Sequence, residues 1–256
     1  MAKKIANPKL EKNVFFDINK LPPEKGLLIF PISMSRTHAS QNAVSCLEYI
    51  RNFTPSKVSK PTIGLNFIYG DFLYLCSNEK AAVLKEQFMH QIINHKNSIQ
   101  KIIQKNQLEF QIQHAFSYMV WNQLYLSTGD FADKLRKIKD IYKKDKKFQE
   151  YVKEDCKIFN KKPDENQINF FLEEHLMLYL LSKGQIYLSN DYIEHNEKWV
   201  LWCYPGKPLK GEVYLYQLNP FNLNWSENRY QNARYNLEDK KLYEFDRIDL
   251  ETYSPK

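Results

Sequence analysis

The sequence predicts an α/β fold, a Rossmann-like parallel sheet with helices on both faces. Apolar runs of strand length alternate along the chain with stretches whose apolar residues recur at helical spacing. This order is typical of parallel sheets, in which each return to a neighbouring strand needs a crossover. With 256 residues, 43% of them hydrophobic, the chain can form one sizeable core. We therefore expect a single domain over residues 1–256, with peripheral extensions at 1–22 and about 222–256.

The first half of the chain contains three predicted strands and two predicted helices. Continuous apolar runs predict strands over Gly26–Ser33 and Pro61–Tyr69, and apolar–polar alternation predicts a third over Leu108–His114. Ser40 is expected to cap the helix that follows it. Residues 79–105 carry apolar side chains at helical spacing and predict a long amphipathic helix.

The second half is predicted to be helical first and then mostly extended. Helices are expected from Ala115 to about Phe159 and over Ile168–Ser182. Three further strands are expected over Gln185–Leu188, Lys198–Pro205 and Gly211–Leu218. Because ligands bind at the carboxyl ends of strands in such sheets, the residues that end these strands are candidates for a site.

Composition excludes several classes of function. With 7 glycines, the chain contains neither GxGxxG nor GxxxxGK[ST], so a glycine-rich phosphate loop is excluded. Its four cysteines form no CxxC pair, which argues against a structural zinc site and favours a reducing compartment. No run approaches the roughly 18 apolar residues of a membrane span. We expect a soluble, cytoplasmic protein, and we take it to be a monomer.

Positive charge is concentrated in two segments of the chain. The net charge is +7. Residues 134–162 carry twelve Lys and Arg against five Asp and Glu, and residues 80–106 carry five Lys against one Glu. Clustered cations suggest a polyanionic partner such as RNA. The alternative is that these are ordinary lysine-rich helices with solvated faces.

Ser33 and Tyr204 each lie at the end of a predicted strand. A serine hydroxyl is a poor nucleophile unless a base takes its proton or the acyl donor is already activated. The sequence contains no GxSxG motif, so a serine that caps a turn is the alternative for Ser33. Tyr204 precedes Pro205 and is either a core tyrosine or a hydrogen-bond donor in the crevice.

Glu174 lies in an unusually apolar setting. Its neighbours at i±3 and i±4 on the predicted helix are all apolar: Phe170, Phe171, Met177 and Leu178. A carboxylate on that face is buried or lines a cavity, and burial raises its pKa and suits it to holding an amine or moving a proton. A salt bridge to another helix is the alternative. Its neighbour Glu173 is expected to be solvated.

Four segments together resemble the tRNA-dependent cyclodipeptide synthases. They are PISMSR, DIYKKDKKFQEYVKEDCKIF, NFFLEE and CYP, and the resemblance runs in order from about Lys25 to Pro208. No single segment is specific, but their order and spacing are. The resemblance implies a fold like the catalytic domain of class I tyrosyl- and tryptophanyl-tRNA synthetases. The ATP-binding signatures of that class are missing from the family and from this chain.

The resemblance assigns roles to residues of this chain. Ser33 would be the nucleophile, Glu174 the catalytic glutamate and Tyr204 the tyrosine of the intermediate site. Arg36 and the pair Tyr204-Pro205 resemble the X-Tyr-Pro subfamily. Phe170 replaces a tyrosine that many members have, so no hydroxyl role carries over to it. The substrate-binding residues would be Ile29, Pro31, Arg36, Asn66, Phe170, Trp202 and Pro205, and Lys96, Lys101 and Lys105 would bind tRNA.

The activity implied is the joining of two aminoacyl-tRNAs into a 2,5-diketopiperazine through aminoacyl- and dipeptidyl-serine intermediates. Because the aminoacyl ester is already activated, Ser33 would need no complete catalytic triad. The mechanism that the resemblance implies requires no ATP, no metal and no other cofactor. Two other functions stay open at this point. The chain could be an RNA-binding protein without catalytic activity, or an aminoacyl-tRNA hydrolase of synthetase-like fold.

Overall fold

The structure is a computed structural model. It describes residues 26–51, 63–70, 81–105, 114–159, 161–185, 199–224 and 228–255. Everything below refers to these residues.

A six-stranded sheet forms the centre of the molecule, in the order β3-β2-β1-β4-β5-β6. All neighbouring strands are parallel except β5 and β6, which pair antiparallel. The strands are β1 (Gly26–Ile32), β2 (Ile63–Tyr69), β3 (His114–Val120), β4 (Trp199–Tyr204), β5 (Ala233–Asn236) and β6 (Lys241–Glu244). The predicted mostly parallel α/β fold is therefore confirmed.

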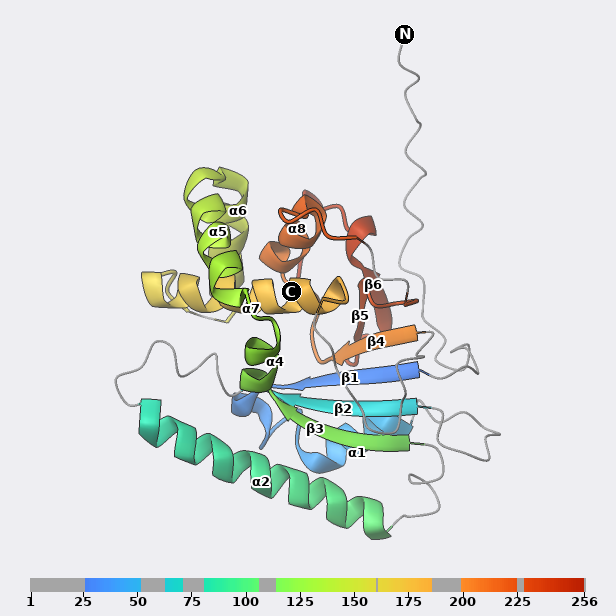
Figure 1. The fold of residues 1–256 in the computed structure, drawn as a ribbon. Coiled ribbons are helices and arrows are strands. Elements are labelled where there is room, and N and C mark those ends of the chain that lie inside the picture. Colours follow the sequence, from blue (N-terminus) through green and yellow to red (C-terminus); the bar gives the residue numbers. More distant parts are fainter. Residues whose placement is uncertain are drawn as a thin grey trace.

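Helices cover both faces of the sheet (Figure 1). In β1, Leu28, Phe30 and Ile32 point into one core, and Leu27 and Ile29 point into the other. This alternation follows from the two-residue period of a strand. The first core is closed by α1 (Ala43–Arg51) and α2 (Ala81–Lys105), and the second mainly by α5 (Phe131–Lys144), α6 (Lys146–Ile158), α7 (Glu165–Ser182) and α8 (Lys210–Leu218). Helix α4 (Trp121–Ser127) leaves β3 at its carboxyl end, and two short 3₁₀ helices cover Met34–Arg36 and Phe245–Arg247.

The strands predicted over Gly26–Ser33, Pro61–Tyr69 and Lys198–Pro205 are confirmed as β1, β2 and β4. The strand predicted over Leu108–His114 lies outside the described residues except for His114. Strand β3 covers His114–Val120, so the start of the stretch predicted to be helical from Ala115 is extended instead. The segment AFSYMV also alternates, and pairing along the whole length of β2 decides in its favour. The strand expected over Gln185–Leu188 lies outside the described residues, apart from Gln185 itself.

The strand predicted over Gly211–Leu218 is wrong, because this segment is helix α8. The alternating pattern of GEVYLYQL is strand-like, but a buried carboxylate from α6 binds the first backbone N–H groups of the helix. Asp155 accepts hydrogen bonds from Lys210 N and Gly211 N at 3.0 and 2.8 Å. This contact spans more than 50 residues of sequence, so the local pattern could not indicate it.

Two further expectations need correction. Asn42, not Ser40, caps α1, since its side-chain oxygen accepts from Val44 N at 3.0 Å and from Ser45 N at 3.1 Å. The segment 222–256, expected to be peripheral, contributes β5 and β6 to the sheet. Residues 1–22 lie outside the described part of the chain. No helix in the described ranges is long and apolar enough to cross a membrane.

Candidate functional site

The site lies where the order of the strands reverses. From β1 the chain continues to β2 and β3 on one side, and it later returns to β4 on the other side of β1. The crossovers on the two sides diverge at this point, and a crevice opens at the carboxyl ends of the two central strands. Ser33 directly follows β1 and Tyr204 is the last residue of β4, so both lie at this crevice.

Two adjoining cavities occupy the crevice. The smaller has a volume of about 50 Å³ and is lined by Pro31, Ile32, Ser33, Ile68, Gly70, Trp121, Phe170, Glu174 and Tyr204. The larger has a volume of about 320 Å³. Pro31, Trp121, Glu174 and Tyr204 line both cavities, which are therefore two parts of one site. The three residues that the sequence singles out for chemistry, Ser33, Glu174 and Tyr204, line the smaller cavity together.

Ser33 lies on a tight turn between β1 and the 3₁₀ helix Met34–Arg36. Its backbone is still extended, with φ −74° and ψ 128°, and its carbonyl accepts a hydrogen bond from Arg36 N at 2.9 Å. The chain therefore turns away immediately after the serine. This turn leaves the partly buried Ser33 at the wall of the smaller cavity.

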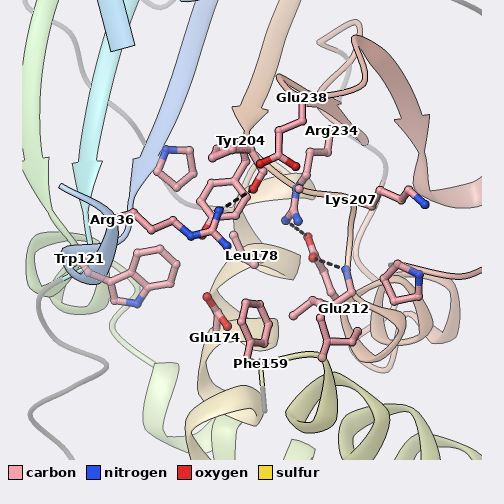
Figure 2. A pocket seen from close by; sticks show the side chains of 16 residues that line it. Arg36, Trp121, Phe159, Glu174, Leu178, Tyr204, Lys207, Glu212, Arg234 and Glu238 are labelled. Atoms are coloured by element: carbon pink, nitrogen blue, oxygen red, sulfur yellow. Dashed lines mark hydrogen bonds and ion pairs between the residues drawn. The ribbon is translucent and has the colours of Figure 1, made fainter. Parts of the chain in front are cut away.

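Glu174 extends from α7 into the pocket, beside Phe159 and Leu178 (Figure 2). Among the described residues it forms no hydrogen bond and no ion pair. Burial raises the pKa of this carboxyl from 4.5 to about 7; Glu212 and Asp155 add to the increase, and His175 and Arg234 oppose it. A carboxylate with this pKa can hold an ammonium group when ionised and can exchange a proton near neutral pH.

Tyr204 lies between two arginines (Figure 2). The guanidinium carbons of Arg36 and Arg234 are 5.4 and 5.7 Å from the centre of its ring. Arg36 also donates from Nη1 to the carbonyl oxygen of Pro205 at 2.9 Å, which ties the turn after Ser33 to the residue after β4. The two halves of the crevice are thus joined by contacts of Arg36.

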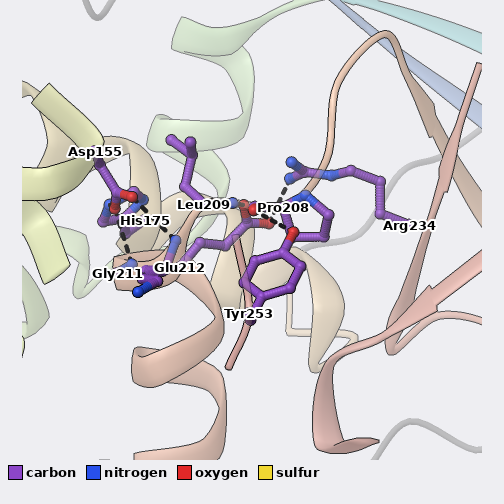
Figure 3. Close-up of polar contacts among 9 residues, drawn as sticks. Asp155, His175, Pro208, Leu209, Gly211, Glu212, Arg234 and Tyr253 are labelled. Carbon is purple, nitrogen blue, oxygen red and sulfur yellow. Dashed lines mark hydrogen bonds and ion pairs between the residues drawn. The ribbon is translucent and has the colours of Figure 1, made fainter. Parts of the chain in front are cut away.

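A buried polar cluster supports the rear of the larger cavity (Figure 3). Asp155 accepts from His175 Nε2 at 3.1 Å in addition to the two backbone N–H groups of α8. A Cβ atom on Gly211 would lie 2.7 Å from His175 Nε2 and 2.8 Å from Asp155 Oδ2, so only glycine fits this approach. Because His175 follows Glu174 directly, the cluster anchors α7 at the turn that carries the pocket carboxylate.

An ion pair forms another wall of the larger cavity. Arg234 of β5 binds Glu212 of α8, and both side chains are almost fully buried. Glu212 also accepts from Leu209 N at 3.3 Å. The C-terminal segment continues over this region, where Tyr253 donates to the Pro208 carbonyl at 2.7 Å and Lys207 donates to the Ser254 carbonyl at 3.0 Å.

The predicted substrate-binding residues are only partly brought together. Pro31, Arg36, Phe170 and Pro205 line the cavities. Ile29, Asn66 and Trp202 line neither of these two cavities and are 0, 0 and 3% exposed. Ile29 and Trp202 belong to the core beneath the site, and Asn66 accepts a hydrogen bond from Ser117 of the neighbouring strand.

Glu173 is buried, at 7% exposure, although the sequence predicted a solvated side chain. Helix α7 packs against α5, α6 and α8. A helix that is enclosed on several sides has little solvated face, and its polar residues are therefore buried with the rest.

Sequence reasoning missed several pocket residues, above all Trp121, Glu212, Arg234 and Glu238. Trp121 follows β3, so a correctly placed third strand would have put it at the carboxyl edge of the sheet. The other three carry no local signal. They come from a segment predicted as a strand and from one predicted to be peripheral, and only the packing of α8 and β5 brings them to the crevice.

The three predicted tRNA-binding lysines lie on α2, on the opposite face of the sheet from α7 (Figure 1). Lys101 and Lys105 are exposed, and within the described ranges neither forms an ion pair. Lys96 is partly buried, with its Nζ 4.9 Å from the centre of the Tyr118 ring. In the other basic segment, four cations are paired with carboxylates: Lys134, Arg136, Lys143 and Lys147.

The described residues contain no group of three or more His, Cys, Asp or Glu side chains that could hold a metal ion. Cys46, Cys156 and Cys203 are free and buried. Burial raises the pKa of the Cys46 thiol to about 12 and of the Cys156 thiol to about 11, which leaves both protonated and unreactive at neutral pH.

Comparison with solved structures finds similar folds at low sequence identity. A protein described as a CDPS from Fluoribacter dumoffii matches with a TM-score of 0.51 and 15% identity, over 84% of this chain and 92% of that one. A CDPS from Staphylococcus haemolyticus matches with a TM-score of 0.48 and 15% identity, over 80% and 88%. A cyclodipeptide synthetase from Mycobacterium tuberculosis, described as related to type I tRNA synthetases, has a TM-score of 0.46 and 12% identity, over 80% and 82%.

The likeness to the Fluoribacter protein extends over nearly the whole of both chains and shows a common fold. No family model and no curated protein matches the sequence.

Proposed function

We propose that this protein is a tRNA-dependent cyclodipeptide synthase of the X-Tyr-Pro subfamily, an aminoacyltransferase that joins the aminoacyl groups of two aminoacyl-tRNAs into a 2,5-diketopiperazine. The single observation that carries the proposal is that Ser33, Glu174 and Tyr204 line one cavity at the reversal point of the sheet. Ser33 offers a nucleophilic hydroxyl, Glu174 a carboxylate that can bind a ligand, and Tyr204 a phenol. The fold shared with a described CDPS agrees with this function.

In the first half-reaction, the Ser33 hydroxyl attacks the carbonyl of the aminoacyl ester. The 3′-terminal ribose oxygen of the tRNA leaves with the proton, and a serine ester of the amino acid remains. Ser33 needs no complete catalytic triad, because its reaction partner is an activated ester.

In the second half-reaction, the amine of the bound aminoacyl group attacks the ester of a second aminoacyl-tRNA. This step forms a dipeptidyl-serine and releases the second tRNA. The free amine of the dipeptide then attacks the serine ester, closes the six-membered ring and restores the Ser33 hydroxyl. The larger cavity of about 320 Å³ adjoins the smaller cavity that Ser33 lines, and it has room for the second aminoacyl group.

Glu174 binds the ammonium group of the first aminoacyl moiety and takes up the proton that this group must lose before it acts as a nucleophile. Its pKa of about 7 suits both tasks. Tyr204 donates a hydrogen bond to the bound intermediate and restricts it to geometries that favour ring closure. Arg36, held by Pro205, keeps the two walls of the cavity at a constant separation.

The tRNA is bound through Lys96, Lys101 and Lys105 of α2, and phosphate contacts of this kind weaken as salt rises. The enzyme acts as a monomer in the cytoplasm, where aminoacyl-tRNAs are available. Neither a metal nor another cofactor enters the steps above.

The proposal is tested by expressing the wild type and Ser33→Ala in a heterologous host and searching the culture medium by mass spectrometry for a new diketopiperazine. Only the wild type should produce one, and intact-protein mass spectra should contain a Ser33-dependent aminoacyl adduct. Ser33→Ala should keep the wild-type melting temperature and tRNA affinity, because the hydroxyl contributes little to packing. Free amino acid in place of the cyclic product would indicate a hydrolase. RNA binding without turnover would indicate a non-catalytic RNA-binding protein.

A further inference from the structure

The Gln41 side chain binds the backbone on both sides of Ile32, directly before the serine. Its Nε2 donates to the Pro31 carbonyl at 2.6 Å, and its Oε1 accepts from Ser33 N at 2.9 Å. Gln41 is 3% exposed and lines neither of the two cavities, so it has no access to a substrate.

These two hydrogen bonds take the place of those that a neighbouring strand would form with this part of β1. On one side, β1 is held by β2 to its last residue, and Gly70 N donates to the Ile32 carbonyl at 2.9 Å. On the other side, pairing with β4 ends at Ile29. The Pro31 carbonyl and the Ser33 N–H point to that unpaired side, because successive residues of a strand alternate in direction. A carboxamide carries a donor nitrogen beside an acceptor oxygen, as a peptide group does, and can therefore bind both the Pro31 carbonyl and the Ser33 N–H.

Gln41 is held in turn from helix α2. Its backbone carbonyl accepts from His95 Nε2 at 2.8 Å, and His95 Nδ1 lies 2.9 Å from the Tyr69 hydroxyl. Because a carbonyl can only accept, Nε2 carries the imidazole proton, and the Tyr69 O–H donates to Nδ1. His95 and Tyr69 are 6 and 0% exposed, so water does not compete for these bonds.

We infer that Gln41 is a positioning residue for Ser33, and that His95 and Tyr69 hold it from the layer that carries the predicted tRNA-binding lysines. His95 directly precedes Lys96 on α2. The inference rests on the proposed function in naming Ser33 as the nucleophile. The hydrogen bonds themselves do not depend on it.

The main variant is Gln41→Met, which has a similar length but lacks both hydrogen-bonding groups. Single-turnover acylation of Ser33 by aminoacyl-tRNA should slow by about 10²-fold, as expected for a reacting group displaced by about 1 Å. The Kd for aminoacyl-tRNA should change less than about twofold, since Gln41 touches no substrate. Asn42→Ala is the matched control: it removes a neighbouring amide that caps α1, and it should leave acylation per folded molecule unchanged.

Gln41→Glu adds a readout that loss of packing cannot mimic. A protonated carboxyl can donate to the Pro31 carbonyl and accept from Ser33 N, whereas a carboxylate would oppose the Pro31 oxygen. The acylation rate of this variant, divided by that of the wild type at the same pH, should rise as pH falls from about 8 to about 5.5. Glu174 titrates in both proteins, so its effect on the acylation rate cancels in this ratio.

Among the described residues, Cys46 and His95 bind the backbone carbonyl of residue 41, and Tyr69 binds His95. His38 interacts electrostatically with His95. Burial raises the pKa of the Cys46 thiol to about 12, raises that of Tyr69 and lowers that of His95. All four groups are present in both proteins, so a trend in the ratio reports on residue 41. If Gln41→Met fails to fold, the pH dependence of the acylation-rate ratio for Gln41→Glu decides alone whether Gln41 positions Ser33.

Backbone amide exchange at Ser33, measured by NMR, tests the hydrogen bond without any substrate. Exchange should be about tenfold or more faster in Gln41→Met than in the wild type, with no change at Leu28 in the middle of β1. Equal exchange at Ser33, full acylation in Gln41→Met or a flat pH ratio for Gln41→Glu would each overturn the inference. If the wild type forms no aminoacyl-enzyme, the proposed function fails, and the exchange measurement still decides whether Gln41 holds Ser33.

Discussion

Glu174 and Asp155 are two carboxylates of the same helical layer with opposite surroundings. Asp155 is fully buried and accepts from two backbone N–H groups and from His175, so its hydrogen-bonding capacity is used within the protein. Among the described residues, Glu174 has no such partner, and it lines both cavities. A buried polar group normally has a partner. We therefore expect a ligand with a positive charge to bind Glu174.

Glu174→Gln should raise stability at high pH and abolish product formation. The raised pKa means that the folded protein binds this proton more tightly than the unfolded chain. The wild type therefore loses stability as pH rises from 4.5 to about 7, and the deficit persists above this range. Because the carboxyl is partly open to the pocket, we expect a deficit of about 1–3 kcal/mol, or about 2–12 °C in Tm.

Thermal melts at pH 4 and pH 8 on purified protein check this prediction. The two proteins should melt alike at pH 4, and the variant should melt higher at pH 8. Its diketopiperazine yield should fall to background, because glutamine keeps the shape but cannot balance an ammonium charge. A sharply lower Tm at pH 8 together with retained activity would assign Glu174 to a structural salt bridge instead.

At the scale of elements, two basic segments are candidates for the proposed tRNA-binding surface. The segment covering α5 and α6 has the larger surplus of cations, but several of them bind carboxylates of the same or a neighbouring element. Lys101 and Lys105 of α2 carry no such pair within the described ranges. A cation already paired with a carboxylate must give up that pair to neutralise a phosphate, whereas an unpaired cation displaces a counterion from the RNA without this cost, which favours α2.

Replacing Lys96, Lys101 and Lys105 together with glutamine should raise KM for aminoacyl-tRNA and leave kcat nearly unchanged. The slope of log K against log salt should become shallower by about 2, since each lost phosphate contact lowers it by roughly 0.7–0.9. The matched control replaces Lys144, Lys146 and Lys153, which are exposed on α5 and α6. If the control changes the slope and the α2 variant does not, the RNA surface lies on α5 and α6.

At the scale of the whole molecule, the ion pair between Arg234 and Glu212 joins β5 to α8. Glu212 is 2% exposed and Arg234 is 6% exposed. This contact links the sheet to the helical layer, and it also forms a wall of the larger cavity. A buried pair of this kind contributes little net stability compared with apolar residues, but losing one partner leaves the other charge uncompensated.

Arg234→Met should therefore destabilise the protein by about 3–5 kcal/mol, and the double variant Arg234→Met/Glu212→Gln should recover part of that loss. At about 2–4 °C per kcal/mol for a chain of this size, the single variant should melt roughly 6–20 °C lower. Thermal melts of Arg234→Met, Glu212→Gln and the double variant, compared with the wild type, complete a double-mutant cycle. Additive effects would contradict the coupling, and the pair would then be two independent packing contacts.

Several parts of the site could be predicted, because the local spacing of apolar residues indicates which side chains are buried. The continuous apolar runs of β1 and β4 identified the two central strands, and hence Ser33 and Tyr204 at their ends. The apolar neighbours of Glu174 identified a carboxylate that is removed from bulk water. Each of these inferences depends on residues within one or two turns, and the structure brings all three residues to one cavity.

The rest was decided by contacts between segments far apart in sequence. The local sequence pattern of α8 is that of a strand. The segment is helical in the structure, where Asp155, 55 residues away, accepts hydrogen bonds from its first N–H groups. Arg234 enters the pocket only because β5 pairs with β4, and Gln41 holds the serine turn only because β4 stops pairing with β1 at Ile29. A local pattern records which side chains avoid water, but it does not record which distant group satisfies a buried N–H, carbonyl or charge. The sequence by itself therefore determined the strands β1, β2 and β4 and the three side chains that share the smaller cavity, and only the tertiary structure decided what surrounds and positions them.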